Sequence, residues 1–386
     1  MTDEPAPSGD EPLAPAEANP PADERLTTDT TAAMANDTAD APAGQLSLAR
    51  RLRDPRTIVS IVLPLVLLAL VFFNLRELNI DQLIATITSA SPLLLLGAFV
   101  VYYLGFPLRG YRWRLLLRSA GTRISLRDST EIIFISWLVN CLVPAKLGDV
   151  YRAWLLRANF IVSLSRTFGT VFIERIFDLF AIAILGLGAA FWSFRGGLPT
   201  EVQVVVGIGL AVLLALSIGL YTVRNFGRRS LLRLPLPGKA KLLEYYERFE
   251  QGVFAINPRQ IPMLAVITAL IWATEAMRLL LVIEALDFRD VHLGISGAFF
   301  VALAASLLTA IPFTPAGLGI VELGVVGILT VIYGVDQTNA VAITLVDRTI
   351  SVFSIWVLGG LAYVFSSKTK GGRERRVAEI ADLGRA

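Results

Sequence analysis

Long apolar runs separated by short basic stretches dominate the hydropathy pattern of this chain. An α-helix rises 1.5 Å per residue, so roughly 20 apolar residues cross the ~30 Å hydrocarbon core of a bilayer. The pattern therefore predicts an all-α, polytopic helical membrane protein. The clearest runs are Thr57–Phe73, Pro92–Leu108, Phe168–Phe191, Val202–Tyr221 and Ile261–Leu286, and a further tract over Gly294–Phe365 is broken at Pro312, Pro315, Gly334 and Asp336.

The beginning of the chain has the opposite character. Its first 45 residues contain ten acidic residues, one basic residue (Arg25) and no aromatic residue. Such a segment cannot bury enough apolar surface to offset its ordering entropy, so we expect a disordered acidic tail over 1–48. It lacks the basic and apolar regions of a cleaved signal peptide, so Thr57–Phe73 is expected to remain as the first helix. The transmembrane domain is placed at 49–367 and a basic cytoplasmic tail at 368–386.

Composition agrees with this class and narrows the chemistry. Hydrophobic residues make up 54% of the chain and charged residues 17%, whereas soluble domains carry about 25% charged residues. A single cysteine, Cys141, and a single histidine, His292, exclude a disulfide framework and a Cys/His zinc site. His292 lies near Asp290 in a short polar stretch, where a solvated side chain is expected. We expect no cofactor, no metal, no nucleic-acid partner and no enzymatic activity.

Lys and Arg mark the cytoplasmic side of membrane proteins and thereby predict the topology. Basic residues precede the first apolar run and recur in the expected loops 109–127 and 224–260, whereas the expected loops 74–91, 194–201 and 287–292 carry few. We therefore predict a multi-pass protein of the cytoplasmic cell membrane with both termini in the cytoplasm. Its basic loops are expected to contact anionic lipid headgroups.

One apolar segment, Glu131–Val143, has basic residues on both sides and does not fit a simple alternation of loops. If both flanks are cytoplasmic, the chain enters the membrane and returns, which predicts a re-entrant hairpin over 128–163 with its turn near Pro144–Gly148. Non-helical backbone at that depth is tolerated where protein buries it or where it lines a wet cavity. Two ordinary spans or a surface helix are the alternatives, and for 295–335 a hairpin and two full spans both stay open.

An internal repeat connects these two regions. Pro144-Ala-Lys-Leu-Gly148 returns as Pro315-Ala-Gly-Leu-Gly319, and each copy follows an apolar arm. An acid–Arg pair begins 30 residues after Pro144, at Glu174, and 32 residues after Pro315, at Asp347. If basic loops are cytoplasmic, the helices that follow the two copies cross the membrane in opposite directions. This predicts inverted repeats of the kind found in transporters. Chance similarity between Leu-, Val- and Gly-rich spans is the alternative.

Several ionisable residues lie within the apolar runs, where an isolated charge costs about 2.5–3.5 kcal/mol on insertion scales. They are expected to face the bundle interior and to pair at three- and four-residue spacing. Two interpretations are open, a polar substrate path or ion pairs that only hold helices together. The residues concerned are Glu174, Arg175 and Asp178, then Glu275 and Arg278, and finally Glu322, Asp347 and Arg348.

Other residues suit the recognition of a lipid phosphate. Arg offers a planar fork of donors, and Trp anchors at the membrane interface, so Arg109, Arg112 and Trp113 suggest a headgroup contact. Lys146, Asp149 and Arg152 lie at the first expected turn. Gly317 and Gly319 allow close approach of backbone N–H groups, which favour anions. Plain anchoring by cytoplasmic arginines is the competing interpretation.

The motifs resemble the flippase-like transmembrane domain of the lysylphosphatidylglycerol synthase family over about 55–365. Four motifs carry the resemblance: Arg109, Arg112 and Trp113; Asn140, Pro144, Lys146, Gly148, Asp149 and Arg152; Glu174, Arg175 and Asp178; and Pro315, Gly317, Gly319 and Glu322 with Arg348 beyond. This chain has Lys146 and Asp149 where the family more often has Arg and Glu. No soluble aminoacyltransferase domain follows, so lipid aminoacylation itself is not expected.

The resemblance implies translocation of an anionic, aminoacylated or polyprenyl-linked lipid between leaflets. Arg109, Arg112, Lys146 and Arg152 would then capture a headgroup phosphate, with Asn140 and Asp149 in the same motif. Glu174, Arg175, Asp178, Glu322 and Arg348 would line the passage, and Gly317 and Gly319 would approach the headgroup. Two other functions are weighed, a membrane-embedded transferase acting on a lipid phosphate with Asp149 or Glu174 as base, and a scaffold for a separate lipid-modifying enzyme.

Overall fold

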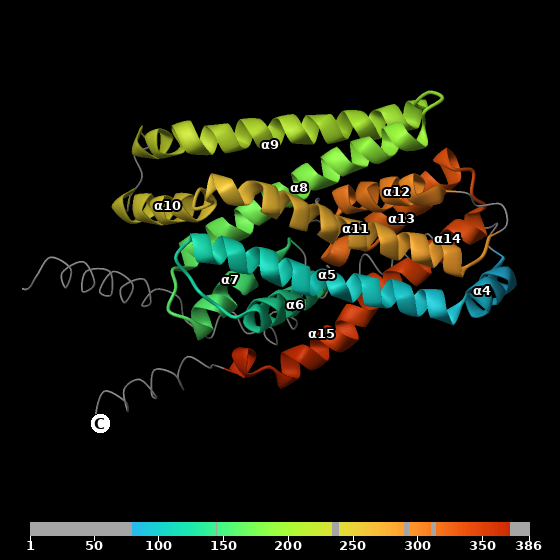
Figure 1. The fold of residues 1–386 in the computed structure, drawn as a ribbon, viewed down its shortest axis with the longest axis horizontal. Helices are drawn as coiled ribbons and strands as arrows, with labels where there is room; N and C mark the ends of the chain where they lie inside the picture. Colours follow the sequence, from blue (N-terminus) through green and yellow to red (C-terminus); the bar gives the residue numbers. More distant parts are fainter. Residues whose placement is uncertain (1–78, 144, 234–238, 289–292, 310–313, 371–386) are drawn as a thin grey trace, which may run out of the picture. The chain divides into compact units, whose positions relative to one another are not determined.

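The computed structural model describes residues 79–143, 145–233, 239–288, 293–309 and 314–370, all within the compact unit Ala43–Ala386. This part of the chain is helical and contains no strand (Figure 1). The all-α prediction is therefore confirmed for it. The predictions for the acidic tail 1–48, the first helix Thr57–Phe73, His292 and most of the tail 368–386 lie outside the described residues.

Six stretches of the described chain are long and apolar enough to cross a membrane. They are Pro92–Ser119, Leu164–Ser193, Thr200–Arg233, Pro258–Ala285, Pro315–Ile332 and Gln337–Phe365. The helices that form and surround them are α4 (Ile80–Ser89), α5 (Pro92–Ser119), α6 (Leu126–Leu142), α7 (Leu147–Asn159), α8 (Leu164–Ser193), α9 (Thr200–Arg233), α10 (Lys239–Val253), α11 (Ile261–Ala285), α12 (Gly294–Leu308), α13 (Ile320–Gly327), α14 (Gln337–Arg348) and α15 (Ser354–Phe365).

Local sequence explains where several helices begin. Ser125 accepts a hydrogen bond from the backbone N–H of Asp128 at 3.0 Å and caps α6. Asp336 caps α14 in the same way, accepting from the N–H of Thr338 at 2.9 Å. Such side chains satisfy the N–H groups that the first helical turn leaves without partners. Pro92 occupies the first position of α5, where its missing N–H is not needed.

Two expected loops are helical, so their predicted boundaries were wrong. The helix α5 continues from Leu108 to Ser119 through the first half of the expected loop 109–127. The helix α9 continues to Arg233, and α10 occupies much of what remains of the expected loop 224–260. In α5 the reason is that Arg109 and Arg112 are buried with acidic partners, so their charge does not end the helix.

The helices pack around one main core. The helix α5 lies along α11, α6 packs against α5, α7 and α15, and α8 packs against α10 and α12 (Figure 1). The core includes Ile132, Leu155, Val282 and Val341, which are almost fully buried. The long helix α9 meets the rest mainly through α8 and α10 and leaves much of its surface exposed.

Short helices lie at the two regions where the sequence predicts breaks, although Pro315–Ile332 taken together is long enough to cross a membrane. The helices α6 and α7, of 17 and 13 residues, pack against each other where the hairpin 128–163 is expected. In the second half, α12 is followed by the 3-10 turn η3 (Pro315–Gly317), α13 and the π-helical turn η4 (Ile328–Ile332). The direction in which each element enters a membrane stays a prediction.

Candidate functional site

The two turns that the sequence pairs share one backbone feature, two consecutive residues with positive φ. Ala145 and Lys146 have φ of 62° and 51°, and at the corresponding positions Ala316 and Gly317 have φ of 51° and 70°. Two consecutive left-handed residues are rare outside glycine, because the Cβ atom crowds the following carbonyl oxygen. The sequence echo is thus also an echo of local structure.

The first turn is fixed to α8 by Arg175. Its Nε and Nη2 atoms donate to the two carboxylate oxygens of Asp149 at 2.8 and 3.0 Å. Asn140 reaches the same turn from α6 and accepts from the N–H of Gly148 at 2.8 Å. A Cβ atom on Gly148 would lie 2.1 Å from the carbonyl oxygen of Ser136, so α6 and α7 can approach this closely only at a glycine.

The second turn is fixed to α14 by Arg348 in a corresponding way. Its Nε donates to Glu322 at 2.5 Å, and its Nη2 donates to the carbonyl oxygen of Ala316 at 2.7 Å. The other oxygen of Glu322 accepts from the N–H of Gly319 at 2.6 Å. Each turn is therefore held by an arginine that follows it by about 30 residues and that pairs with an acid just beyond the turn.

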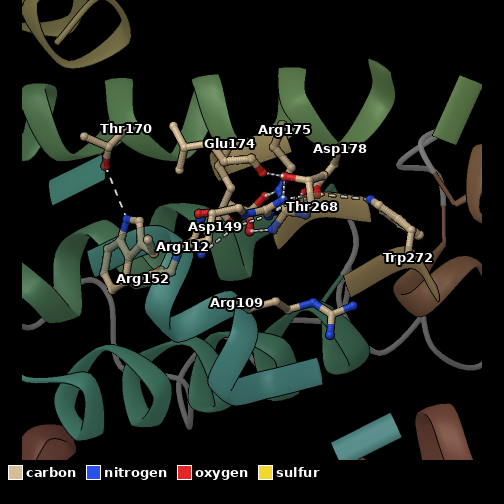
Figure 2. Close-up of polar contacts among 12 residues, drawn as sticks. Arg109, Arg112, Asp149, Arg152, Thr170, Glu174, Arg175, Asp178, Thr268 and Trp272 are labelled. Carbon is tan, nitrogen blue, oxygen red and sulfur yellow. Dashed lines mark hydrogen bonds and ion pairs between the residues drawn. The ribbon is translucent and has the colours of Figure 1, made fainter. Parts of the chain in front are cut away.

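A buried ion cluster connects α5, α7 and α8 (Figure 2). Arg112 binds Asp178 through two hydrogen bonds, at 2.6 and 3.1 Å, and also donates to Glu174 at 3.0 Å. Arg152 donates to the same oxygen of Glu174 at 3.2 Å. Both arginines are 1% exposed, so their charge depends on these partners rather than on water. This cluster joins the three helices through charged side chains.

A second buried group links α5, α11 and α14. Arg109 donates to Glu275 at 2.6 Å, and Arg278 approaches Glu275 at 3.4 Å and Asp347 at 3.2 Å. Aromatic rings cover the two arginines: Trp137 lies 4.7 Å from the Arg109 guanidinium and Tyr102 lies 5.1 Å from that of Arg278. Ring faces favour a desolvated cation, which adds to the ion pairs.

Between these groups lies a cavity of about 330 Å³, which we call the chamber. Both turns reach it, through Lys146 on one side and Ala316 and Gly317 on the other. Four basic and three acidic side chains line its wall: Lys146, Arg175, Arg278 and Arg348, and Asp178, Glu275 and Asp347. Such a volume is at the lower end of the roughly 300–1,000 Å³ typical of small-molecule sites.

Lys146 differs from the other cations of the wall. Arg175, Arg278 and Arg348 each pair with an acid within 4 Å. Among the described residues Lys146 makes no ion pair, and its turn holds it in a left-handed conformation. The chamber wall therefore carries one ammonium group in excess of its acids, which can bind an anion that enters.

The thirteen residues singled out from the sequence separate into two sets. Those lining the chamber are Asn140, Lys146, Arg175, Asp178, Gly317 and Arg348, and those behind its wall are Arg109, Arg112, Asp149, Arg152, Glu174, Gly319 and Glu322. Trp113, expected at the interface, is fully buried and donates to Thr170 at 3.3 Å. The expectation of a surface headgroup contact for Arg112 and Trp113 was wrong, because both side chains fill the α5–α8 interface.

Sequence reasoning missed the aromatic side chains of the wall. Trp272 lines the chamber and donates to Asp178 at 3.2 Å, and Trp137 covers both Arg109 and Arg175. Trp272 precedes Glu275 by three residues on α11, so a search for aromatics one turn from buried charges would have found it. Within the described chain, no group of three or more His, Cys, Asp or Glu side chains gathers as metal ligands would.

Comparison with known proteins identifies the family. The sequence pattern of the lysylphosphatidylglycerol synthase TM region matches residues 57–359. Because this match covers most of the chain, the protein belongs to that family, and the resemblance seen in the four motifs is confirmed. It also supports the conclusion that the protein is a multi-pass membrane protein.

Individual relatives extend this finding. A UPF0104 membrane protein of Methanocaldococcus jannaschii is 36% identical over 225 residues, which cover 58% of this chain and 92% of the relative. The glycosyltransferase AglD of Haloferax volcanii is 26% identical over 355 residues, or 83% of this chain, and the match spans 56% of that protein. A UPF0104 membrane protein of Pyrococcus horikoshii is 23% identical over 322 residues, or 95% of its length.

Proposed function

We propose that this protein moves a lipid with an anionic, phosphate-bearing headgroup between the leaflets of the cytoplasmic membrane. The chamber is the headgroup path, and the hydrocarbon chains stay in the bilayer. Aminoacylated and polyprenyl-linked lipids belong to the class, since both carry a phosphate. The observation that supports the proposal most is that Lys146 makes no ion pair with any described residue, in a chamber whose other charges are neutralised by partners.

We further propose that the two turns belong to inverted repeats, each a re-entrant hairpin that meets the other at the chamber. The shared left-handed pairs and the corresponding arginine braces support this arrangement. Helix breaks near the bilayer midplane, formed by two oppositely oriented halves, are how many transporters build a substrate site. In the predicted topology both termini lie in the cytoplasm.

The chemistry of the wall suits passage rather than tight capture. A phosphate that meets Lys146 exchanges hydrogen bonds with water for a charge-assisted hydrogen bond, while the neighbouring arginines remain paired with their acids. A single extra cation attracts an anion but binds it less tightly than several free arginines would. The paired charges keep the chamber polar at little net charge, which lowers the barrier for a headgroup that leaves water.

Reconstitution tests this function directly. The purified full chain is placed in vesicles with fluorescent phosphatidylglycerol or phosphatidylcholine, and transfer is followed by a quencher that reaches only the outer leaflet. We expect transfer of phosphatidylglycerol above protein-free vesicles and faster than that of phosphatidylcholine. Equal rates with and without protein, across several anionic lipids including a polyprenyl phosphate, would contradict the proposal.

A second candidate is a membrane-embedded transferase acting on a lipid phosphate, which the similarity to the glycosyltransferase AglD favours. In that case Asp149 or Glu174 would act as base, although both are held by arginines. Mass spectrometry of the lipids before and after incubation with a sugar-nucleotide donor separates the two functions. A mass change requires the transferase, and unaltered lipid on the opposite leaflet requires the transporter. Full activity after joint neutralisation of Glu174, Arg175 and Asp178 would favour a scaffold for a separate enzyme.

A further inference from the structure

A second, larger depression lies on the other side of α8 from the chamber. It has a volume of about 1550 Å³, well above the roughly 300–1,000 Å³ of ordinary ligand sites, and α8, α9, α10 and α11 form its walls. We call it the lateral groove. Most of its lining is apolar, including Ile176, Phe177 and Phe180 of α8 and Ala265 of α11.

The polar residues of the lateral groove gather near α10. They are Arg166, Arg224 and Arg228 on one hand, and Glu247, Glu250 and Gln251 on the other. Arg228 pairs with Glu247 at 3.0 Å, and Arg166 donates to Gln251 at 2.7 Å while its Nε atom is buried with no hydrogen-bond partner. Arg224 makes no ion pair within the described chain and faces the ring of Phe254 at 5.9 Å. With Arg228 and Glu247 paired, the remaining charges at this end are Arg166 and Arg224 against Glu250, and this excess of one positive charge favours a negative group.

Charge at one end and apolar surface along the rest match the anatomy of a single lipid. Along α8 the lining runs from Arg166 to Leu185, and 19 helical residues rise about 28 Å. One leaflet contributes about half of the ~30 Å hydrocarbon thickness, so an acyl chain fits along this wall.

We propose that the lateral groove binds an anionic diacyl phospholipid, with its phosphate at Arg224 and Arg166 and one chain along α8 and α11. The inference deepens the proposed function, because it rests on lipid transport for its purpose and names the tail site. Binding itself does not depend on transport.

The groove and the chamber are neighbours. On α11, Thr268 lines the lateral groove and Trp272, one turn later, lines the chamber. Thr268 accepts from Arg112 at 2.9 Å, and Trp272 donates to Asp178 at 3.2 Å (Figure 2). The two cavities therefore flank one seam between α8 and α11, about 18 Å along α8 from Arg166, so the acyl chain of a bound lipid would lie beside the chamber wall.

Photo-crosslinking tests the groove in the full chain embedded in nanodiscs. The probes are phosphatidylglycerol and phosphatidylcholine, each with a diazirine in one acyl chain, and the adducts are mapped by mass spectrometry. We expect adducts concentrated on α8 near Phe177 and on α11 near Ala265, with more from phosphatidylglycerol. Adducts spread evenly over every lipid-facing helix would overturn the inference. So would an unlabelled groove in a protein that runs as a dimer, since a second copy would then cover it.

Matched variants separate the two parts of the site. Ala265→Trp fills the groove and is expected to reduce these adducts about tenfold, whereas its exposed neighbour Val266→Trp leaves them unchanged. Arg224→Gln is expected to reduce the preference for the anionic probe about fivefold, and Arg229→Gln, which lies outside the groove, serves as control. Unchanged labelling in Ala265→Trp overturns the tail site.

The vesicle transfer assay separates lipid binding in the groove from lipid transfer between leaflets. Groove labelling in a wild-type protein that transfers no lipid would defeat the transport proposal and leave the binding site standing. Transfer by a protein whose groove is never labelled would defeat the binding site and leave transport standing.

Discussion

The turn at Ala145–Gly148 and the turn at Ala316–Gly319 start alike but differ in one side chain and in how they end, because Leu147 begins α7 whereas Leu318 is extended. Both have two consecutive left-handed residues, and both are held by an arginine from a later helix. At the second left-handed position the first turn has Lys146 and the second has Gly317. Glycine adopts this conformation freely, whereas any other residue pays about 1–2 kcal/mol.

This difference indicates what the first turn is for. A lysine held in a conformation that glycine adopts freely is a local strain, and such strain persists mainly at functional sites. The strained conformation places a cation on the chamber wall, where the second turn contributes Ala316 and Gly317. We infer that the second turn is a structural counterpart and that the first carries the recognition of the headgroup.

The largest expected effect on stability comes from removing Arg175 or Arg348, the two arginines that hold the turns. Arg348→Ala leaves Glu322 buried and without its cation, which is expected to destabilise the protein by about 3–5 kcal/mol. Arg175→Ala should destabilise it less, because the Arg175 side chain is 24% exposed and that of Arg348 is 10% exposed. Unfolding in detergent measures both, with exposed Arg229→Ala as control. A smaller loss for Arg348→Ala than for Arg175→Ala would show that the second turn is not held in this way.

The next largest effect tests the need for glycine in the second turn. At Gly317 φ is 70°, and a Cβ atom would lie 2.6 Å from a methyl group of Val321. Gly317→Ala is therefore expected to lower the free energy of unfolding by about 1–2 kcal/mol or more, since strain and crowding add. Gly327→Ala, where a Cβ meets open space on a helix, is the matched control and should be neutral or stabilising. Equal stability of the two variants would argue against this account.

A smaller effect on stability is expected when the first turn is made like the second. Lys146→Gly removes the left-handed strain but gives the unfolded chain more freedom, so the two effects nearly cancel, within about 1 kcal/mol. Thermal unfolding in detergent measures the difference. A loss of several kcal/mol would mean that Lys146 has a structural partner and that its conformation is not a strain kept for function.

The smallest effect concerns a half-buried ion pair on α6, the helix that leads into the first turn. Lys368 binds Asp128 at 2.6 Å and Glu131 at 3.1 Å. Burial alone would raise the pKa of Asp128, but hydrogen bonds with Lys368 and Ser125 outweigh it and lower that pKa. Burial likewise opposes the charge of Lys368, yet its bonds to Asp128 and Glu131 raise the pKa of this ammonium group.

The sign of the pH dependence follows from these shifts. The lowered pKa of Asp128 gives a stabilisation that is present above about pH 4 and lost as the pH falls further. The raised pKa of Lys368 gives one that is complete below about pH 10 and lost above its folded pKa. The stability difference between wild type and Lys368→Gln should thus be flat from about pH 5 to 9, at about 0.2–1 kcal/mol, and shrink at both ends. A difference that grows at low pH would contradict this assignment.

Hydropathy predicted most of the fold because bilayer thickness alone fixes the length of an apolar helix. The positions of basic residues predicted the loop boundaries less well. Arg109 and Arg112 suggested a loop, yet both continue α5 because acids on α8 and α11 neutralise them. That pairing depends on which helices touch, and a single sequence does not reveal contacts between distant segments. The two left-handed turns could be found because their turn chemistry is local, whereas Trp137 and Trp272 were missed since their role exists only in the packed bundle.

The central claim is that the charge of Lys146, which has no ion-pair partner in the described part of the chain, admits the headgroup phosphate. The most direct test compares wild type, Lys146→Gln and Lys146→Arg for the initial rate of phosphatidylglycerol transfer in the same vesicles. A charged hydrogen bond is worth about 1.5–3 kcal/mol, so Lys146→Gln should transfer at least about tenfold more slowly, while Lys146→Arg keeps most of the rate. Wild-type transfer by a properly folded Lys146→Gln protein would contradict the account.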